Sequence, residues 1–70
     1  MNVKNQMKLD KAKKFLDSKG IMYYEFKNGQ LQVDQINYWA TTEKWYDPIR
    51  NVKGVGMNSF IKHLKNNEII

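Results

Sequence analysis

The sequence contains no cysteine, only one histidine and one proline, and no long apolar run. Without cysteine there is no disulfide framework and no thiolate metal site. His63 alone would leave a structural zinc site to carboxylate ligands, which rarely form one. Neither an apolar stretch of about 18 residues nor the apolar stretch of a signal peptide is present. We therefore expect a cytoplasmic protein with no cofactor and no membrane association.

Seventy residues predict a single small domain with a limited core. A chain of this length buries only about 60% of its unfolded surface, so each large side chain supplies a sizeable part of the stability. Nine aromatic residues and four methionines must provide much of that packing. The sequence leaves open whether Trp39 and Trp45 belong to the core or to the surface.

The net charge is +5, and the positive charge is concentrated at the two ends of the chain. Residues 1–19 carry a net charge of +4, residues 20–47 carry −2, and residues 48–70 carry +3. A small basic protein of this kind favours a polyanionic partner such as nucleic acid. A solvated surface on a soluble protein explains the same charges.

Two stretches have apolar residues at helical spacing. They are Leu9, Ala12, Phe15 and Leu16 in the first, and Met57, Phe60, Ile61 and Leu64 in the second. We expect helices at about 6–19 and 57–66. Gly20 followed by Ile21 predicts a Schellman ending for the first helix, and residues 67–70 are expected to form a frayed tail.

The segment IMYYEFKNGQLQVD predicts a β-hairpin at about 21–34. Asn28-Gly29 separates two alternating segments, and both residues accept the positive φ of a type I′ turn. A two-residue loop there would leave Tyr23 exposed on the polar face. It would gather the following residues on the other face: Met22, Tyr24, Phe26, Leu31 and Val33.

A second hairpin is predicted at about 36–47, after a slip in the alternation at 34–36 that indicates a bulge or bend. Alternation separates Ile36, Tyr38 and Ala40 from Asn37 and Trp39. A turn at 41–44 would place Trp39 opposite Tyr46. Pro48 lacks the N–H needed to continue a ladder, so residues 48–56 are expected to form a loop.

These elements predict an α+β fold in a single domain spanning residues 1–70. The expected order is α-β-β-β-(β)-α, with two helices packed on one face of an antiparallel meander. We do not expect an enzyme, because no serine or threonine has a recognisable base motif and the acids form no metal-ligand cluster in the sequence.

Basic and aromatic side chains in and after the second hairpin are the best candidates for contacts with nucleic acid, since single-strand binders combine ring platforms with cations. They are Lys44, Trp45, Tyr46, Arg50 and Lys53, with Lys11 and Lys14 in the first helix as weaker candidates. Both indoles could instead pack in the core, and the helix lysines could form a solvated face. Gly54 and Gly56 could present N–H groups to an anion, or could simply let the chain turn.

The segment INYWATTEKWY, followed by KGVG and an apolar helix, resembles a pattern in small uncharacterised bacteriophage and prophage proteins. The resemblance rests on Tyr38, Trp39, Thr41, Thr42, Lys44, Trp45, Gly54 and Gly56. Glu43 stands where the pattern has glycine, and Ala40 where it often has proline. The resemblance implies a phage-type accessory protein in the host cytoplasm, a class that often binds and blocks host components.

Two functions therefore remain in competition. The leading prediction is a non-catalytic phage-type accessory protein that binds nucleic acid through basic and aromatic residues. The alternative is a protein-binding inhibitor of a host or anti-phage defence factor, in one version a homodimer joined through an open sheet edge or exposed aromatic residues.

Overall fold

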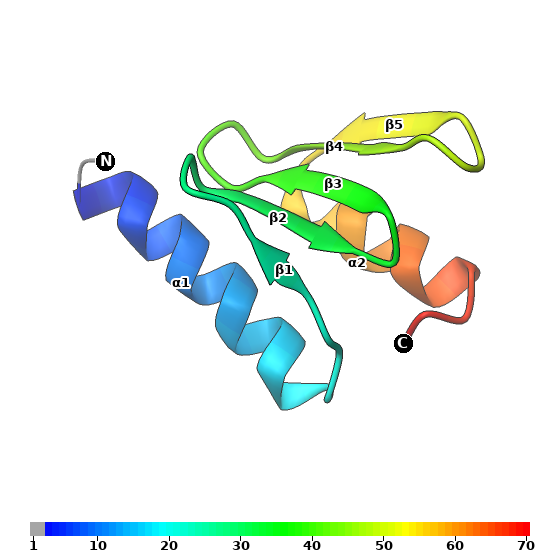
Figure 1. Ribbon diagram of the computed structural model, residues 1–70, viewed down its shortest axis with the longest axis horizontal. Coiled ribbons are helices and arrows are strands. Elements are labelled where there is room, and N and C mark those ends of the chain that lie inside the picture. Colours follow the sequence, from blue (N-terminus) through cyan, green and yellow to red (C-terminus); the bar gives the residue numbers. More distant parts are fainter. Residues whose placement is uncertain (1–2) are drawn as a thin grey trace.

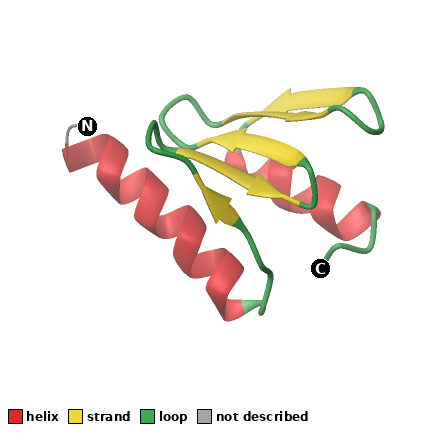
Figure 2. Ribbon diagram, viewed as in Figure 1, coloured by secondary structure: helices red, strands yellow, loops and turns green. Residues whose placement is uncertain are grey.

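The computed structural model describes residues 3–70 and contains a five-stranded antiparallel sheet with one helix before it and one after it (Figure 1). The helices are α1 (Val3–Ser18) and α2 (Met57–Asn66), and the strands are β1 (Tyr24–Glu25), β2 (Gln30–Val33), β3 (Ile36–Trp39), β4 (Lys44–Asp47) and β5 (Val52–Val55). Each strand pairs with its sequence neighbours, in the order β1-β2-β3-β4-β5, as Figure 2 also shows. The predicted α+β meander is confirmed.

Within residues 3–70, neither helix is long and apolar enough to cross a membrane.

The helix α1 ends in the Schellman motif that the sequence predicts. The Gly20 N–H donates to the Asp17 carbonyl at 3.1 Å, and the Ile21 N–H donates to the Leu16 carbonyl at 3.0 Å. Gly20 has a φ of 67°, a conformation that costs glycine little because it has no Cβ. The buried side of α1 consists of Leu9, Ala12 and Leu16.

The first hairpin has a different register from the predicted one. Tyr24 pairs with Gln32, and the Phe26 N–H donates to the Gln30 carbonyl at 2.8 Å. The loop therefore contains three residues instead of two, and it ends at Gly29, whose φ is 75°. Three-residue hairpin loops with glycine in the left-handed position are a common alternative to the two-residue type I′ turn.

This one-residue shift reverses the face that every β1 side chain occupies. Tyr24 and Phe26 consequently lie on the opposite side of the sheet from Leu31 and are 63% and 38% exposed. Tyr23 moves the other way and packs against the core. The predicted apolar face and the predicted exposure of Tyr23 are both wrong.

The break in apolar–polar alternation at residues 34–36 corresponds to a tight turn between β2 and β3. Asp34 and Gln35 have φ values of 47° and 71°, and Val33 pairs directly with Ile36. Two successive positive φ values between paired strands are the type I′ geometry. The turn returns Ile36 to the buried face without a bulge in either strand.

The second half of the sheet contains one more strand than the sequence indicated. Trp39 pairs with Lys44 instead of Tyr46, a shift of two residues that keeps every side chain on its expected face. The predicted loop at 48–56 is wrong, because Val52–Val55 forms β5 and pairs with β4. The β4 strand does end before Pro48, but the chain then reverses and adds a strand.

A single buried cluster lies between the sheet and both helices. It contains Leu9, Ala12, Leu16, Leu31, Val33, Ile36, Tyr38, Ala40, Trp45, Phe60 and Leu64. The rings of Tyr38 and Phe60 stack with their centroids 4.5 Å apart, which joins β3 to α2. Burial, followed by the charge of Glu43, raises the pKa of Tyr38 to about 12. Both helices thus cover the same face of the sheet.

The helix α2 has the bounds that the sequence predicts, but the residues after it are not frayed. The Ile69 N–H donates to the Leu64 carbonyl at 2.9 Å, and the Ile69 side chain packs against the core. Glu68 takes a positive φ of 58° to make this turn. The end of the chain therefore folds back onto the domain.

Candidate functional site

Because both helices cover the same face of the sheet, no helix within residues 3–70 covers the other face. Two rows of side chains cross this face, because side chains opposite one another in neighbouring strands point the same way. The first row is Phe26, Gln30, Trp39, Lys44 and Val55, and the second is Tyr24, Gln32, Asn37, Tyr46 and Lys53. We call these ten residues the open face. It carries four aromatic rings, three carboxamides and two lysines.

The rings of the open face form two separate groups. Trp39 on β3 is half-buried and Tyr46 on β4 is 36% exposed. On the same face, at the β1 edge of the sheet, the rings of Tyr24 and Phe26 lie 4.8 Å apart. Each group exposes ring surface to solvent, and the carboxamides lie between the two groups.

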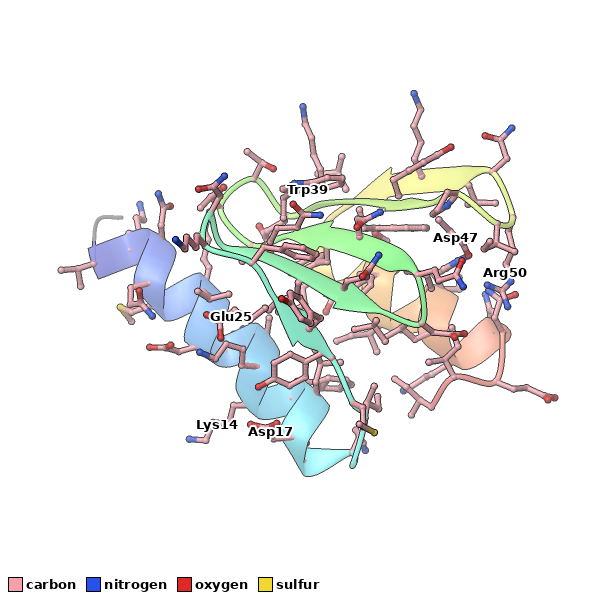
Figure 3. All side chains as sticks on the ribbon, viewed as in Figure 1. Lys14, Asp17, Glu25, Trp39, Asp47 and Arg50 are labelled. Atoms are coloured by element: carbon pink, nitrogen blue, oxygen red, sulfur yellow. The ribbon has the colours of Figure 1, made fainter. Side chains whose placement is uncertain are left out.

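The two lysines of the open face have no acidic partner. Lys44 and Lys53 are exposed, and neither forms an ion pair within residues 3–70. The nearby strand acids point to the other side of the sheet: Glu25 pairs with Lys13 of α1 at 3.1 Å, and Asp47 is buried (Figure 3). The open face is therefore positive, with no carboxylate among its ten residues.

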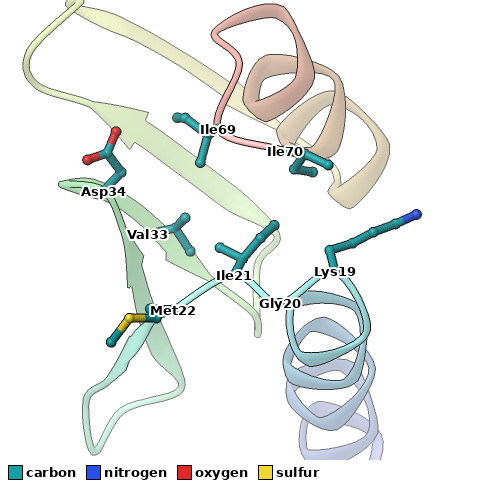
Figure 4. A pocket seen from close by; sticks show the side chains of 8 residues that line it. All are labelled: Lys19, Gly20, Ile21, Met22, Val33, Asp34, Ile69 and Ile70. Atoms are coloured by element: carbon teal, nitrogen blue, oxygen red, sulfur yellow. The ribbon is translucent and has the colours of Figure 1, made fainter.

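A shallow hollow marks the part of the open face where rings and cations meet. Its volume is about 390 Å³, and it is lined by Trp39, Lys44, Trp45, Tyr46, Lys53, Gly54 and Val55. A second hollow of about 440 Å³ lies where the α1–β1 connection approaches the end of the chain (Figure 4). Its lining has one lysine, one aspartate and otherwise mainly apolar groups, without a cluster of polar side chains.

Trp45, a predicted binding residue, belongs to the core. It lies on the helix-covered face and is only 5% exposed. Its Nε1–H donates to Ser59 Oγ at 2.9 Å, and its ring stacks on His63 with centroids 4.6 Å apart. A ligand on the open face would meet Trp39. The structure places Trp45 in the core, although it also lines the hollow of the open face. The contact of Trp45 with a ligand therefore stays a prediction.

The side chain and the backbone N–H of Arg50 both bond the buried carboxylate of Asp47. The guanidinium Nη1 lies 2.9 Å from Asp47 Oδ2, and the backbone N–H donates to Asp47 Oδ1 at 3.0 Å. The Ile49 N–H and the His63 ring supply further bonds to the same carboxylate, at 3.0 and 2.8 Å. Arg50 therefore holds the β4–β5 turn and is not brought together with the open-face lysines.

The environment of Asp47 sets its charge. Burial by itself would raise the pKa of this carboxyl group. The hydrogen bonds from His63 and from the backbone and side chain of Arg50 outweigh burial and lower the pKa to about 2. The carboxylate is ionised at neutral pH, and it serves as a structural anchor.

The two predicted anion-binding glycines have structural roles. A Cβ on Gly54 would lie 2.6 Å from Cζ2 of the Trp45 indole, so only glycine leaves room for that ring. The Gly56 N–H donates to the Glu43 carbonyl at 2.8 Å and is not available to an anion. Gly54 leaves room for the Trp45 indole in the core. The Gly56 N–H adds one backbone hydrogen bond beyond the β4–β5 pair, just before α2 begins.

Lys11 and Lys14 are exposed on α1, which covers the other face of the sheet. In Figure 3, Lys14 projects from α1 on the side of the molecule away from Trp39. The structure therefore brings together Lys44, Tyr46 and Lys53 from the predicted set. Lys14 lies on a separate surface, whereas Lys11 lines a hollow with Glu43, Val55 and Gly56 at the edge of the sheet.

Within residues 3–70, no three histidine, aspartate or glutamate side chains come together as a metal site would require.

Trp39 could have been recognised from alternation alone. If the turn between β3 and β4 has an even number of residues, Trp39 and Trp45 lie on opposite faces of the sheet, whichever residues are paired. Tyr38 and Ala40 belong to the apolar set, so their cross-strand partner Trp45 belongs to the core. No comparable pattern in the sequence marks Gln30, Gln32 and Asn37 as binding residues, because polar residues are common on the solvated face of a strand.

Comparisons with protein-family models, with curated proteins and with solved structures found no match. The resemblance to phage proteins stays a prediction, and the functional argument rests on the open face.

Proposed function

We propose that the protein binds single-stranded nucleic acid on its open face. The observation that supports this function is that Trp39 and Tyr46 lie beside Lys44 and Lys53, which form no ion pair within residues 3–70, on a sheet face whose ten residues include no carboxylate. Aromatic rings stack on bases of any sequence, and lysines neutralise the phosphates that connect them. A positive face without rings would attract polyanions but would have no means of holding bases.

The shape of the surface favours a single strand over a duplex. Five strands spaced by about 4.8 Å give a surface roughly 19 Å wide. Trp39 and Tyr46 are diagonal neighbours, whose Cα atoms lie about 7–8 Å apart in an antiparallel pair. That spacing suits separate, unstacked bases, whereas the bases of a duplex are paired and stacked and cannot reach the rings.

The test compares two lysine pairs that carry equal charge on different surfaces. K44Q/K53Q removes the open-face cations and K62Q/K65Q removes two exposed cations of α2, and each variant lowers the net charge from +5 to +3. Binding of a labelled, mixed-sequence single strand of about 12 nucleotides is followed by fluorescence anisotropy between about 50 and 200 mM salt. We expect K44Q/K53Q to weaken binding and to reduce the slope of log K against log salt by about 1.4, because each phosphate contact contributes about 0.7.

K62Q/K65Q should change both quantities much less, because α2 covers the other face of the sheet. Equal losses in the two variants would mean that net charge alone attracts the strand, which contradicts a built site. If the wild-type protein shows no affinity at low salt, the proposal is wrong. A partner retained in nuclease-treated lysate would then favour the protein-binding alternative.

The rings are tested separately from the charges. Trp39→Ala should weaken binding by about 1–3 kcal/mol, the usual contribution of one stacked base, without changing the salt slope. Ile49→Ala is the control, because this side chain is 65% exposed and lies outside the open face. Circular dichroism of each variant checks that the sheet is intact.

A further inference from the structure

We infer that Gln30 and Asn37 together recognise a base edge and give the open face a preference for adenine; this inference rests on the proposed function. The pair lies between the two groups of rings, on neighbouring strands β2 and β3. Gln30 is opposite Trp39, and Asn37 precedes Trp39 by two residues on the same strand. A base stacked on Trp39 therefore has both carboxamides beside it.

The two carboxamides hold each other in place. Gln30 Nε2–H donates to Asn37 Oδ1 at 3.0 Å, and both side chains are half-buried. Within residues 3–70, no other protein group bonds the remaining polar atoms of the pair. Gln30 Oε1 is left as an acceptor, and the Asn37 Nδ2 group and the second N–H of Gln30 Nε2 are left as donors, so the pair presents both kinds of group.

The hydrogen-bonded Gln30–Asn37 pair offers an acceptor and a donor, and an edge of adenine offers a donor and an acceptor in return. The N6 amino group of adenine donates, and the neighbouring ring nitrogen accepts, on both its Watson–Crick and its Hoogsteen edge. Asparagine and glutamine are the usual partners of adenine for this reason. The Watson–Crick edge of cytosine offers the same pair, N4–H and N3, so the preference for adenine comes from its having two such edges. The open face has no arginine to favour guanine.

The neighbours of the pair complete the arrangement. In the first row, Lys44 stands on the other side of Trp39 from Gln30, so a cation and an amide flank the same ring. The rings of Tyr24 and Phe26 lie beyond the carboxamides and offer a platform for a further base. A strand crossing from β5 towards β1 would meet cations first, then the Trp39 platform with its amide pair, then the second platform.

The experiment measures anisotropy with oligo(dA), oligo(dC) and oligo(dT) of equal length at one salt concentration. We expect the wild-type protein to bind oligo(dA) about fivefold or more tightly than the other two, the lower end of what one good bidentate contact supplies. Q30M/N37L keeps the size of both side chains and removes their hydrogen bonds, so it should bind the three strands about equally while its salt slope stays unchanged.

Asn66→Leu is the matched control, because Asn66 is an exposed carboxamide of α2 that lies outside the open face. It should keep the preference for oligo(dA). Gln30→Met alone replaces the double variant if the latter fails to fold, as judged by circular dichroism.

The outcomes separate the two proposals. Equal binding of the three strands by the wild-type protein, a preference for oligo(dC) or oligo(dT), or a preference for oligo(dA) that survives Q30M/N37L would overturn the inference and leave the proposed function in place. Absence of binding to all three strands at low salt would overturn both.

Discussion

Asp47 is the buried anchor of the β4–β5 turn, and its stabilising contribution depends on pH. Its pKa falls from 3.8 in the unfolded chain to about 2 in the folded protein, so the stability that it supplies is fully present above about pH 4 and is lost as the pH falls towards 2. We expect the free energy of unfolding to fall by about 2 kcal/mol over that range from this group. Urea unfolding followed by tryptophan fluorescence at several pH values measures it.

Asp47→Asn should destabilise the protein by about 3 kcal/mol at neutral pH, because it leaves Arg50 and His63 without their carboxylate. It should also flatten the pH dependence between pH 4 and pH 2. Asp10→Asn, at an exposed position on α1, is the control and should keep the slope of the wild-type protein. An unchanged slope in Asp47→Asn would show that another acid is responsible.

Gly54 makes a second prediction at the scale of one residue. Replacing a glycine inside a strand by alanine normally stabilises a protein by about 0.5–1 kcal/mol, because glycine loses more backbone entropy on folding. Here the new Cβ would meet the Trp45 indole at 2.6–2.8 Å, and we expect Gly54→Ala to destabilise by about 1–3 kcal/mol instead. Thermal unfolding of Gly54→Ala measures the sign directly.

The same substitution in a Trp45→Leu background separates the clash from other effects. With the indole absent, Gly54→Ala should be neutral or stabilising, and the difference between the two backgrounds gives the coupling between the residues. Equal destabilisation in both backgrounds would place the cause in the backbone of β5.

At the scale of elements, the turn between β2 and β3 contains a residue that tolerates its geometry poorly. Asp34 and Gln35 both have positive φ, and glutamine has no special tolerance for that region. D34N/Q35G supplies the preferred type I′ dipeptide and should stabilise the protein by about 1 kcal/mol. For a chain of this size, that gain corresponds to a rise in Tm of roughly 4–8 °C.

Gln32→Gly is the control for this effect, because Gln32 lies within β2, outside the positive-φ turn. Glycine there should destabilise by about 0.5–1 kcal/mol, since it only adds entropy to the unfolded chain. A fall in Tm for D34N/Q35G would contradict the assigned turn geometry.

At the scale of the whole molecule, the two helices on one face give the two indoles different surroundings. Trp45 is enclosed between β4 and α2, and Trp39 is half-buried on the open face. Trp45→Phe leaves Trp39 as the only indole, and Trp39→Phe leaves Trp45. The emission of the Trp45→Phe variant should lie further to the red and should be quenched more strongly by acrylamide than that of Trp39→Phe. Equal quenching would mean that the open face is covered.

The amino-acid sequence by itself determined the features that depend on neighbouring residues. The apolar spacing in 57–66 gave α2 its bounds, and Gly20 with Ile21 gave the end of α1, because helix periodicity and caps involve residues within a few positions of one another. Alternation in 36–39 likewise placed Tyr38 inward and Trp39 outward. These patterns also predicted an antiparallel meander between two helices.

Only the tertiary structure decided what depends on distant contacts. Asn28-Gly29 allows a loop of two or three residues, and the choice turned Tyr24 and Phe26 to the open face while Tyr23 packed against the core. The strand β5 contains a glycine, which weakens a strand signal, yet Gly54 is needed there because the Trp45 indole lies against it. Backbone pairing and core packing between residues far apart in the chain selected these arrangements, and local propensity does not contain that information.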